Sequence, residues 1–186
     1  YLSLGASPVV LALAAWTLVL NADYTGAAGA WSYLPLLNPL DLGQIFVLGT
    51  LFVWVREQSR ARGVLFAVLG ALTFAWLSAG AARTVHHWLG VPFVWDRLVD
   101  SVALQASWSI LWTLLALGLM IHATRRGLRT LWFAGFGLLG VVGLKLMLVD
   151  TAHVNTLGRT VSLLGVALLV IAASYFAPTP PKSAAS

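Results

Sequence analysis

The 186-residue sequence contains no cysteine and only six acidic residues. The absence of cysteine excludes disulfides, zinc–thiolate sites, iron–sulfur clusters and thiol catalysis. Charged residues make up 9% of the chain, whereas a soluble domain needs about a quarter to cover its water-facing surface. Because 60% of the residues are hydrophobic, most of the exterior must be solvated by lipid.

The chain nevertheless carries a net charge of +5, which could indicate binding to nucleic acid. Its basic residues lie in short clusters between apolar runs, a pattern typical of cytoplasmic loops in membrane proteins. We therefore expect no nucleic-acid partner, and membrane lipids as the main surroundings of the chain.

Apolar segments of about 20 residues cross a bilayer as helices, because backbone amides cannot remain unpaired in lipid. The sequence predicts an all-α membrane protein, a bundle of about six transmembrane helices with short loops, over residues 1–176. A disordered tail, 177–186, follows it. Two longer connections, 22–41 and 83–101, are expected to lie along the outer membrane surface or to dip into the bundle. The expected spans are 5–21, 42–55, 63–82, 102–122, 130–149 and 160–176.

The basic residues predict the orientation of these spans. Two connections, 56–62 and 123–129, each contain three arginines and fall on one side, which the positive-inside rule assigns to the cytoplasm. Both ends of the segment then lie in the cytoplasm. The chain begins at Tyr1 inside an apolar run with no basic segment ahead of it, which indicates part of a longer polypeptide rather than a signal peptide.

Polar residues gather at the opposite ends of the spans. Candidate acids or bases are His86, His87 and His153, with Asp100 and Asp150 as carboxylates that could orient them. Candidate ligand-binding residues are Arg83 and Arg159, which could hold an anion, together with Lys145 and Asp41. The simpler alternative is that residues at helix exits are polar because they meet water and headgroups. The full set is Asp41, Arg83, His86, His87, Asp96, Arg97, Asp100, Asp150, His153 and Arg159.

Lys145 is the only basic residue inside an expected span. At that depth a cation either extends to the interface, pairs with a carboxylate or binds a substrate. We favour a structural role, in which Lys145 extends to the interface or pairs with Asp41, Asp100 or Asp150. The glycines at 137, 140 and 143 precede Lys145 at a spacing of three and predict a face where two helix backbones approach closely.

No metal or cofactor is expected. His86 and His153 could ligate a haem only if they faced each other, and no spacing in the sequence indicates that. The chain has no H-E-x-x-H motif and no carboxylate pair inside a span, which argues against a zinc or aspartyl protease.

Four stretches resemble a bacterial family of long multi-pass membrane proteins described as domain of unknown function 2339. They are Y-L-P-L-L-N-P-L-D-L (33–42), L-W-T-L-L-A-L-G-L (111–119) followed by R-R-G-L-R, G-L-K-L-M-L-V-D (143–150) and R-T-V-S-L-L-G-V-A-L-L (159–169). The resemblance implies a bacterial inner-membrane envelope protein and a segment from the C-terminal part of a longer chain. It implies no particular reaction.

Two functions remain open. The first is a module of a larger envelope protein, acting in transport or as a scaffold, whose outer polar rim engages a lipid-linked or glycan precursor. The alternative is a membrane-embedded enzyme that acts on a lipid-linked or cell-wall substrate at the outer leaflet. Expected partners are the remainder of a longer polypeptide or other membrane subunits.

Overall fold

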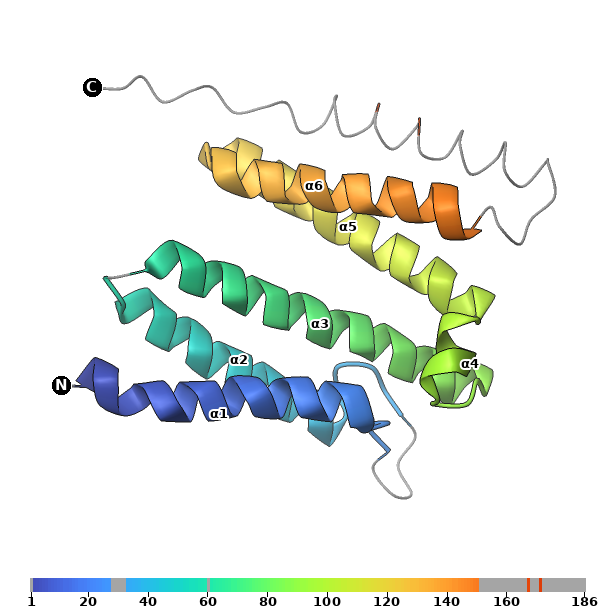
Figure 1. Cartoon of the computed structure of the whole chain (residues 1–186), viewed down its shortest axis with the longest axis horizontal. Coiled ribbons are helices and arrows are strands. Elements are labelled where there is room, and N and C mark those ends of the chain that lie inside the picture. Colours follow the sequence, from blue (N-terminus) through green and yellow to red (C-terminus); the bar gives the residue numbers. More distant parts are fainter. Residues whose placement is uncertain (1, 28–32, 60, 151–166, 168–170, 172–186) are drawn as a thin grey trace. The chain divides into compact units, whose positions relative to one another are not determined.

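The computed structural model describes residues 2–27, 33–59 and 61–150, with residues 167 and 171 (Figure 1). Every regular element in these residues is helical, which confirms the predicted all-α membrane fold. The residues at 153 and 159, most of the expected span 160–176 and the tail 177–186 lie outside the described part. The elements are α1 (Leu2–Asp23), α2 (Pro39–Glu57), α3 (Arg62–Leu89), α4 (Trp95–Val99), α5 (Val102–Arg126), α6 (Arg129–Lys145) and a π-helix (Leu146–Asp150) that continues α6.

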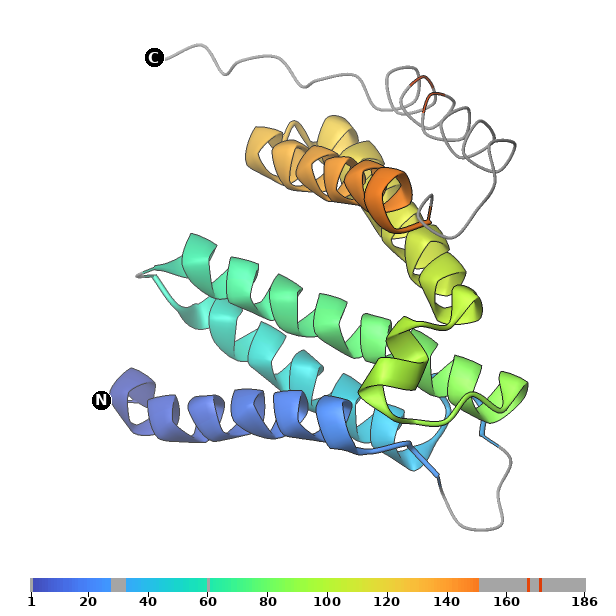
Figure 2. The same cartoon turned by 45° about the vertical axis from the view of Figure 1, so that its right-hand side comes forward.

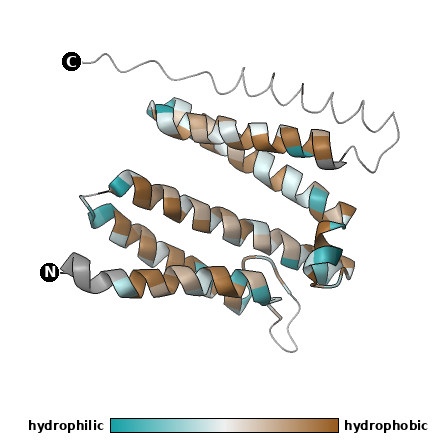
Figure 3. Cartoon of the chain, in the orientation of Figure 1, coloured by the Kyte–Doolittle hydropathy of each residue, from teal (hydrophilic) through white to brown (hydrophobic). Residues whose placement is uncertain are grey.

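Four helices are long and apolar enough to cross a membrane: α2, α3, α5 and the segment Arg129–Leu148. In the described part of α1, Pro8–Asp23 forms a shorter apolar helix. Brown, hydrophobic residues cover most of these helices in Figure 3. Large apolar side chains point outward, among them Leu11, Phe46 and Val102. Their exposure is expected for a protein surrounded by hydrocarbon, so the chain is a multi-pass membrane protein.

The chain divides into unit 1, residues 1–104, and unit 2, residues 105–186. In unit 1, α1, α2 and α3 pack side by side, as both views show (Figures 1 and 2). The core of unit 1 lies between α2 and α3 and contains Leu48, Leu51, Leu72 and Trp76, against which residues of α1 also pack. These residues recur every three or four positions, which aligns them on one face of each helix.

Helix α3 extends seven residues beyond the expected span 63–82. The sequence placed residues 83–89 in a surface segment, but they contain no glycine or proline and continue the helix to Leu89. Gly90 ends it in the left-handed conformation, at φ 67°, and its N–H bonds the carbonyl of His86. Arg83, His86 and His87 are therefore rigidly held on α3 rather than carried by a loop.

In unit 2, α5 and α6 form a hairpin around Ala116, Met120, Trp132 and Leu139. The backbones approach most closely at Gly135, where an added Cβ would lie 2.9 Å from the Ala116 carbonyl oxygen. The glycine stripe expected to pack starts two residues later, on nearly the opposite face of α6. At positions 137 and 140 of that stripe, no atom of the described residues lies within 4 Å of an added Cβ.

Candidate functional site

The start of α2 places an acidic side chain inside unit 1. Asn38 is the N-cap, and its side-chain oxygen accepts a bond of 3.0 Å from the N–H of Asp41. Pro39 occupies the first turn, where its missing N–H costs nothing. Asp41 also lies in that first turn, where the helix dipole favours a negative charge. The local sequence N-P-L-D thus both starts the helix and fixes the carboxylate.

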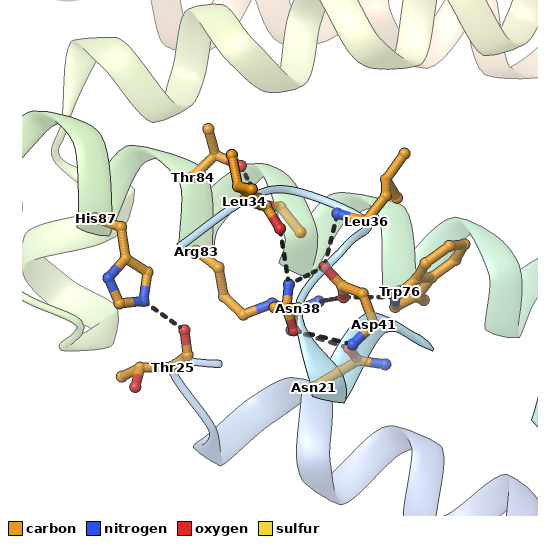
Figure 4. Close-up of polar contacts among 11 residues, drawn as sticks. Asn21, Thr25, Leu34, Leu36, Asn38, Asp41, Trp76, Arg83, Thr84 and His87 are labelled. Atoms are coloured by element: carbon orange, nitrogen blue, oxygen red, sulfur yellow. Dashed lines mark hydrogen bonds and ion pairs between the residues drawn. The ribbon is translucent and has the colours of Figure 1, made fainter. Parts of the chain in front are cut away.

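The Asp41 carboxylate is 1% exposed and accepts four hydrogen bonds (Figure 4). One oxygen accepts from the Leu36 N–H at 3.1 Å and the Asn38 amide at 2.6 Å. The other accepts from the Trp76 indole at 2.9 Å and the Arg83 guanidinium at 2.8 Å. These donors come from α3 and from the chain just before α2, so the carboxylate joins both elements.

Arg83 is the cation of this cluster and is completely buried. Its Nη2 pairs with Asp41, and its Nη1 donates to the side-chain oxygen of Asn21 on α1 at 3.1 Å. Helices α1, α2 and α3 therefore meet at one guanidinium. The sequence grouped Asp41 and Arg83 on the same rim, but it offered Asp41 to Lys145 and did not pair these two residues.

Residues near both ends of the α1–α2 loop contact the last turns of α3 beside this cluster. The Tyr33 ring stacks on His87, with centroids 4.3 Å apart, and the Trp88 indole donates to the Tyr33 carbonyl. The Nε2 of His87 lies 2.8 Å from the carbonyl oxygen of Thr25. The last two turns of α3 thus hold residues of the loop in place. Tyr33 itself is buried.

The two neighbouring histidines both bond backbone carbonyls. The Nδ1 of His86 lies 2.6 Å from the Val91 oxygen, and His87 bonds Thr25 as described. These bonds make each bonded nitrogen the protonated one in the neutral ring. A carbonyl carries no full negative charge, so it stabilises the imidazolium that forms when a histidine acts as a base less than a carboxylate does. In the described part of the chain, the geometry therefore favours structural roles for both rings.

Several buried polar atoms of this cluster have no hydrogen-bond partner among the described residues. Two are nitrogen donors, Nδ2 of Asn21 and Nε of Arg83. The hydroxyl of Tyr33, which can both donate and accept, interacts with Arg83 and Thr84. Gln44 lies three residues after Asp41 on the same buried face of α2, and both atoms of its amide are also without a partner. Burial and, next, the charge of Asp41 raise the pKa of Tyr33 above its ordinary value of 10.0, so its hydroxyl stays protonated at neutral pH.

The other site residues expected from the sequence are not part of the Asp41–Arg83 cluster. Lys145, in unit 2, donates to the Gln105 carbonyl at 3.0 Å and to the Ser109 hydroxyl at 2.9 Å, both on α5. Asp100 is exposed at the end of α4, as are Asp96 and Arg97. The side chain of Asp150 is not described, and the residues at 153 and 159 lie outside the described part. Among the described residues, no group of three metal-ligating side chains forms.

A family model described as "Predicted membrane protein (DUF2339)" matches residues 1–180. The chain belongs to this family. The match confirms the resemblance that four stretches of the sequence indicated. No curated protein and no solved structure matches the sequence.

Several residues of the cluster in this member of the DUF2339 family were not expected from the sequence. Asn21 and Gln44 are polar residues within or beside apolar spans, and such residues usually face protein rather than lipid. That rule would have found both. Asn38 followed by proline is a helix-start signal that would have placed Asp41 in a first turn. Nothing in the sequence indicates that Trp76 bonds Asp41, because that contact depends on the register of α3 against α2.

Proposed function

We propose that this chain is a non-catalytic module of a larger bacterial inner-membrane protein, and that unit 1 binds a lipid-linked envelope precursor. The observation that carries the proposal is a polar cluster and an apolar groove on the same helices. The groove is lined by Val9, Ala12, Leu13, Trp16 and Val47 of α1 and α2. Trp16 lies about one and a half turns of α1 before Asn21, so the groove ends about 7.5 Å along the helix from the polar cluster.

This arrangement suits an amphiphile. The groove spans Val9 to Trp16, about 10 Å of helix at about 1.5 Å per residue. Its walls are apolar side chains of α1 and α2, so we take its occupant to be a prenyl or acyl chain. The polar part of the same molecule would then lie at the Asn21–Asp41–Arg83 end, where water and headgroups begin.

The positive-inside rule supports an extracytoplasmic position for that end. Arg56 closes α2 and Arg62 opens α3, at the opposite end of unit 1 from Asp41. Teal, hydrophilic segments lie where α2 ends and α3 begins in Figure 3. With the arginines in the cytoplasm, the polar cluster faces outward. Binding is favoured over catalysis because the carboxylate and both histidines are already committed to hydrogen bonds within the protein.

The test is binding of a defined probe, a polyprenyl diphosphate carrying an N-acetylated sugar, to the 186-residue chain in lipid nanodiscs. Ala12→Trp fills the groove, and we expect it to weaken binding about tenfold, which corresponds to about 1.4 kcal/mol. Ala15→Trp is the matched control, since Ala15 is exposed on the same helix and does not line the groove. Native mass spectrometry measures the bound fraction.

We expect the probe to be recovered intact after prolonged incubation. Hydrolysis of the probe would identify an enzyme and overturn the non-catalytic proposal. Absence of binding, or equal binding by the two tryptophan variants, would overturn the binding site.

A further inference from the structure

The turn between α5 and α6 brings three arginines to one end of the hairpin in unit 2. Arg125 and Arg126 end α5, and Arg129 begins α6. Gly127 adopts the left-handed conformation, at φ 66°, and the N–H of Leu128 bonds back into the last turn of α5. The chain therefore reverses within two residues. Arg125 and Arg126 are exposed, and Arg129 is half-buried.

No acidic side chain of unit 2 lies near this positive charge. Asp150 is the only acidic residue among residues 105–186, and it lies beyond the other end of α6. The distance along the helix from Arg129 to Asp150 is about 30 Å, at about 1.5 Å per residue, whereas the Debye length is about 8 Å at physiological salt. The charge of the turn is thus not compensated within unit 2.

The basic turn of unit 1 differs in two respects. It contains Glu57, the last residue of α2, next to Arg56. The guanidinium of Arg62 also donates to the carbonyl of Arg56, so part of its hydrogen-bonding capacity is used within the turn. Among the described residues, the three guanidinium groups of the α5–α6 turn form no hydrogen bond or ion pair. They are therefore available to a ligand.

An apolar surface follows this charge along α6. The guanidinium carbon of Arg129 lies 5.8 Å from the centroid of the Phe133 ring, one turn further into the helix. Phe133 and Phe136 are each 52% exposed. The order of groups along this face, cations first and exposed aromatic rings next, matches that of a phospholipid, in which the acyl chains follow the phosphate.

Charge decides which phospholipid headgroup fits the turn. Guanidinium groups bind phosphate oxygens through paired, charge-assisted hydrogen bonds. A zwitterionic headgroup also carries an ammonium group, which would lie among three arginines with no carboxylate of unit 2 close enough to receive it. A headgroup without an ammonium group avoids this repulsion. The lack of acidic side chains thus favours an anionic phospholipid.

We infer that Arg125, Arg126 and Arg129 bind the phosphate of an anionic phospholipid, whose acyl chain lies against Phe133. The attraction of a membrane protein to anionic lipid grows with each arginine near the membrane surface. The positive-inside rule predicts that this lipid belongs to the cytoplasmic leaflet. The site shares no residue with the groove of unit 1, and the inference does not depend on the proposed function.

The test is lipid binding to the 186-residue chain in detergent micelles, followed by native mass spectrometry. The lipid probes are phosphatidylglycerol and phosphatidylethanolamine with identical acyl chains, and we expect phosphatidylglycerol to bind more tightly. Arg126→Gln and Arg129→Gln should each weaken its binding about fivefold and leave that of phosphatidylethanolamine unchanged. Arg62→Gln is the matched control, because it removes one exposed arginine from the turn of unit 1 and should change neither.

An equal loss with Arg62→Gln would show a general effect of net charge and would overturn the site. Equal binding of the two lipids by the wild type would overturn the choice of an anionic headgroup. Glycerol 3-phosphate, which has the phosphate without acyl chains, should bind more weakly than phosphatidylglycerol. If it bound equally well, the arginines would hold a soluble anion, and the lipid site would be overturned.

Discussion

At the scale of single residues, the Asp41–Arg83 pair controls the stability of unit 1. Removing two charges from water costs several kcal/mol per ion, and a buried pair persists only when other hydrogen bonds help to satisfy it. Asp41 receives three such bonds besides that of Arg83, from Leu36, Asn38 and Trp76. The carboxylate is thus held by four donors on two segments, one just before α2 and the other on α3.

Asp41→Asn keeps the shape of the side chain and removes its charge. It leaves Arg83 as an uncompensated buried cation and turns an amide toward groups that are themselves donors. We expect the free energy of unfolding to fall by about 3–5 kcal/mol. Unfolding in mixed micelles, followed by tryptophan fluorescence, measures this change.

Asp23→Asn is the matched control, because Asp23 is exposed at the end of α1. It should change the free energy by no more than about 0.5 kcal/mol. Combining Asp41→Asn with Arg83→Met should recover part of the loss, since the second change removes the stranded cation. Additive losses in the double variant would contradict the pairing.

Only part of the site could be predicted from the sequence. Position relative to the apolar spans predicted that Asp41 and Arg83 would share one end of the bundle. It could not predict their pairing, because partners 42 residues apart are set by how the helices pack. The histidines were expected to be acids or bases on a surface segment, and their bonds to backbone carbonyls could be seen only once α3 was known to continue through them.

At the scale of elements, the sequence predicted each described membrane helix from its apolar length. The predicted and the observed helices differ in where they begin and end. The N-terminus of α2 follows from Asn38 and Pro39, and the C-terminus of α3 follows from Gly90, so both ends depend on known local signals. The glycine that packs against α5 was not predicted. Regular spacing in sequence shows that small residues share a stripe, but it does not show which helix each stripe faces, and the stripe at 137, 140 and 143 stays a prediction.

Gly135→Ala tests the close approach of α5 and α6. The added methyl would lie 2.7 Å from Cγ of Met120 and 2.9 Å from the Ala116 carbonyl oxygen. The methionine can move, but the backbone oxygen moves only with its helix. We therefore expect a loss of about 1–3 kcal/mol in the free energy of unfolding.

Gly137→Ala is the control on the same helix, where an added Cβ has no described neighbour within 4 Å. Replacing glycine by alanine there should leave stability unchanged or raise it by up to about 1 kcal/mol, because alanine favours the helix. The two variants differ by one methyl group at positions two residues apart. If Gly137→Ala were the more damaging change, the hairpin would pack through the stripe predicted from the sequence.

At the scale of the whole molecule, charge asymmetry determines how the protein lies in the membrane. The α2–α3 turn carries arginines at 56, 60 and 62, and the α5–α6 turn carries Arg125, Arg126 and Arg129. Each unit thus presents one basic hairpin turn. The positive-inside rule predicts that each of these turns lies in the cytoplasm, and the proposed orientation then puts the Asp41–Arg83 cluster on the outer side. The proposed binding of a precursor at the outer leaflet depends on this orientation.

The absence of native cysteine makes the orientation directly measurable. We expect a membrane-impermeant maleimide to label Ala27→Cys and Val94→Cys on intact spheroplasts, and to label Ser59→Cys and Leu128→Cys only after permeabilisation. All four positions are exposed, and none of these substitutions alters a charge that sets the topology. Ser59 reports on unit 1 and Leu128 on unit 2. Labelling of Ser59→Cys on intact spheroplasts would place the polar cluster in the cytoplasm, and a headgroup at the outer leaflet could then not reach it.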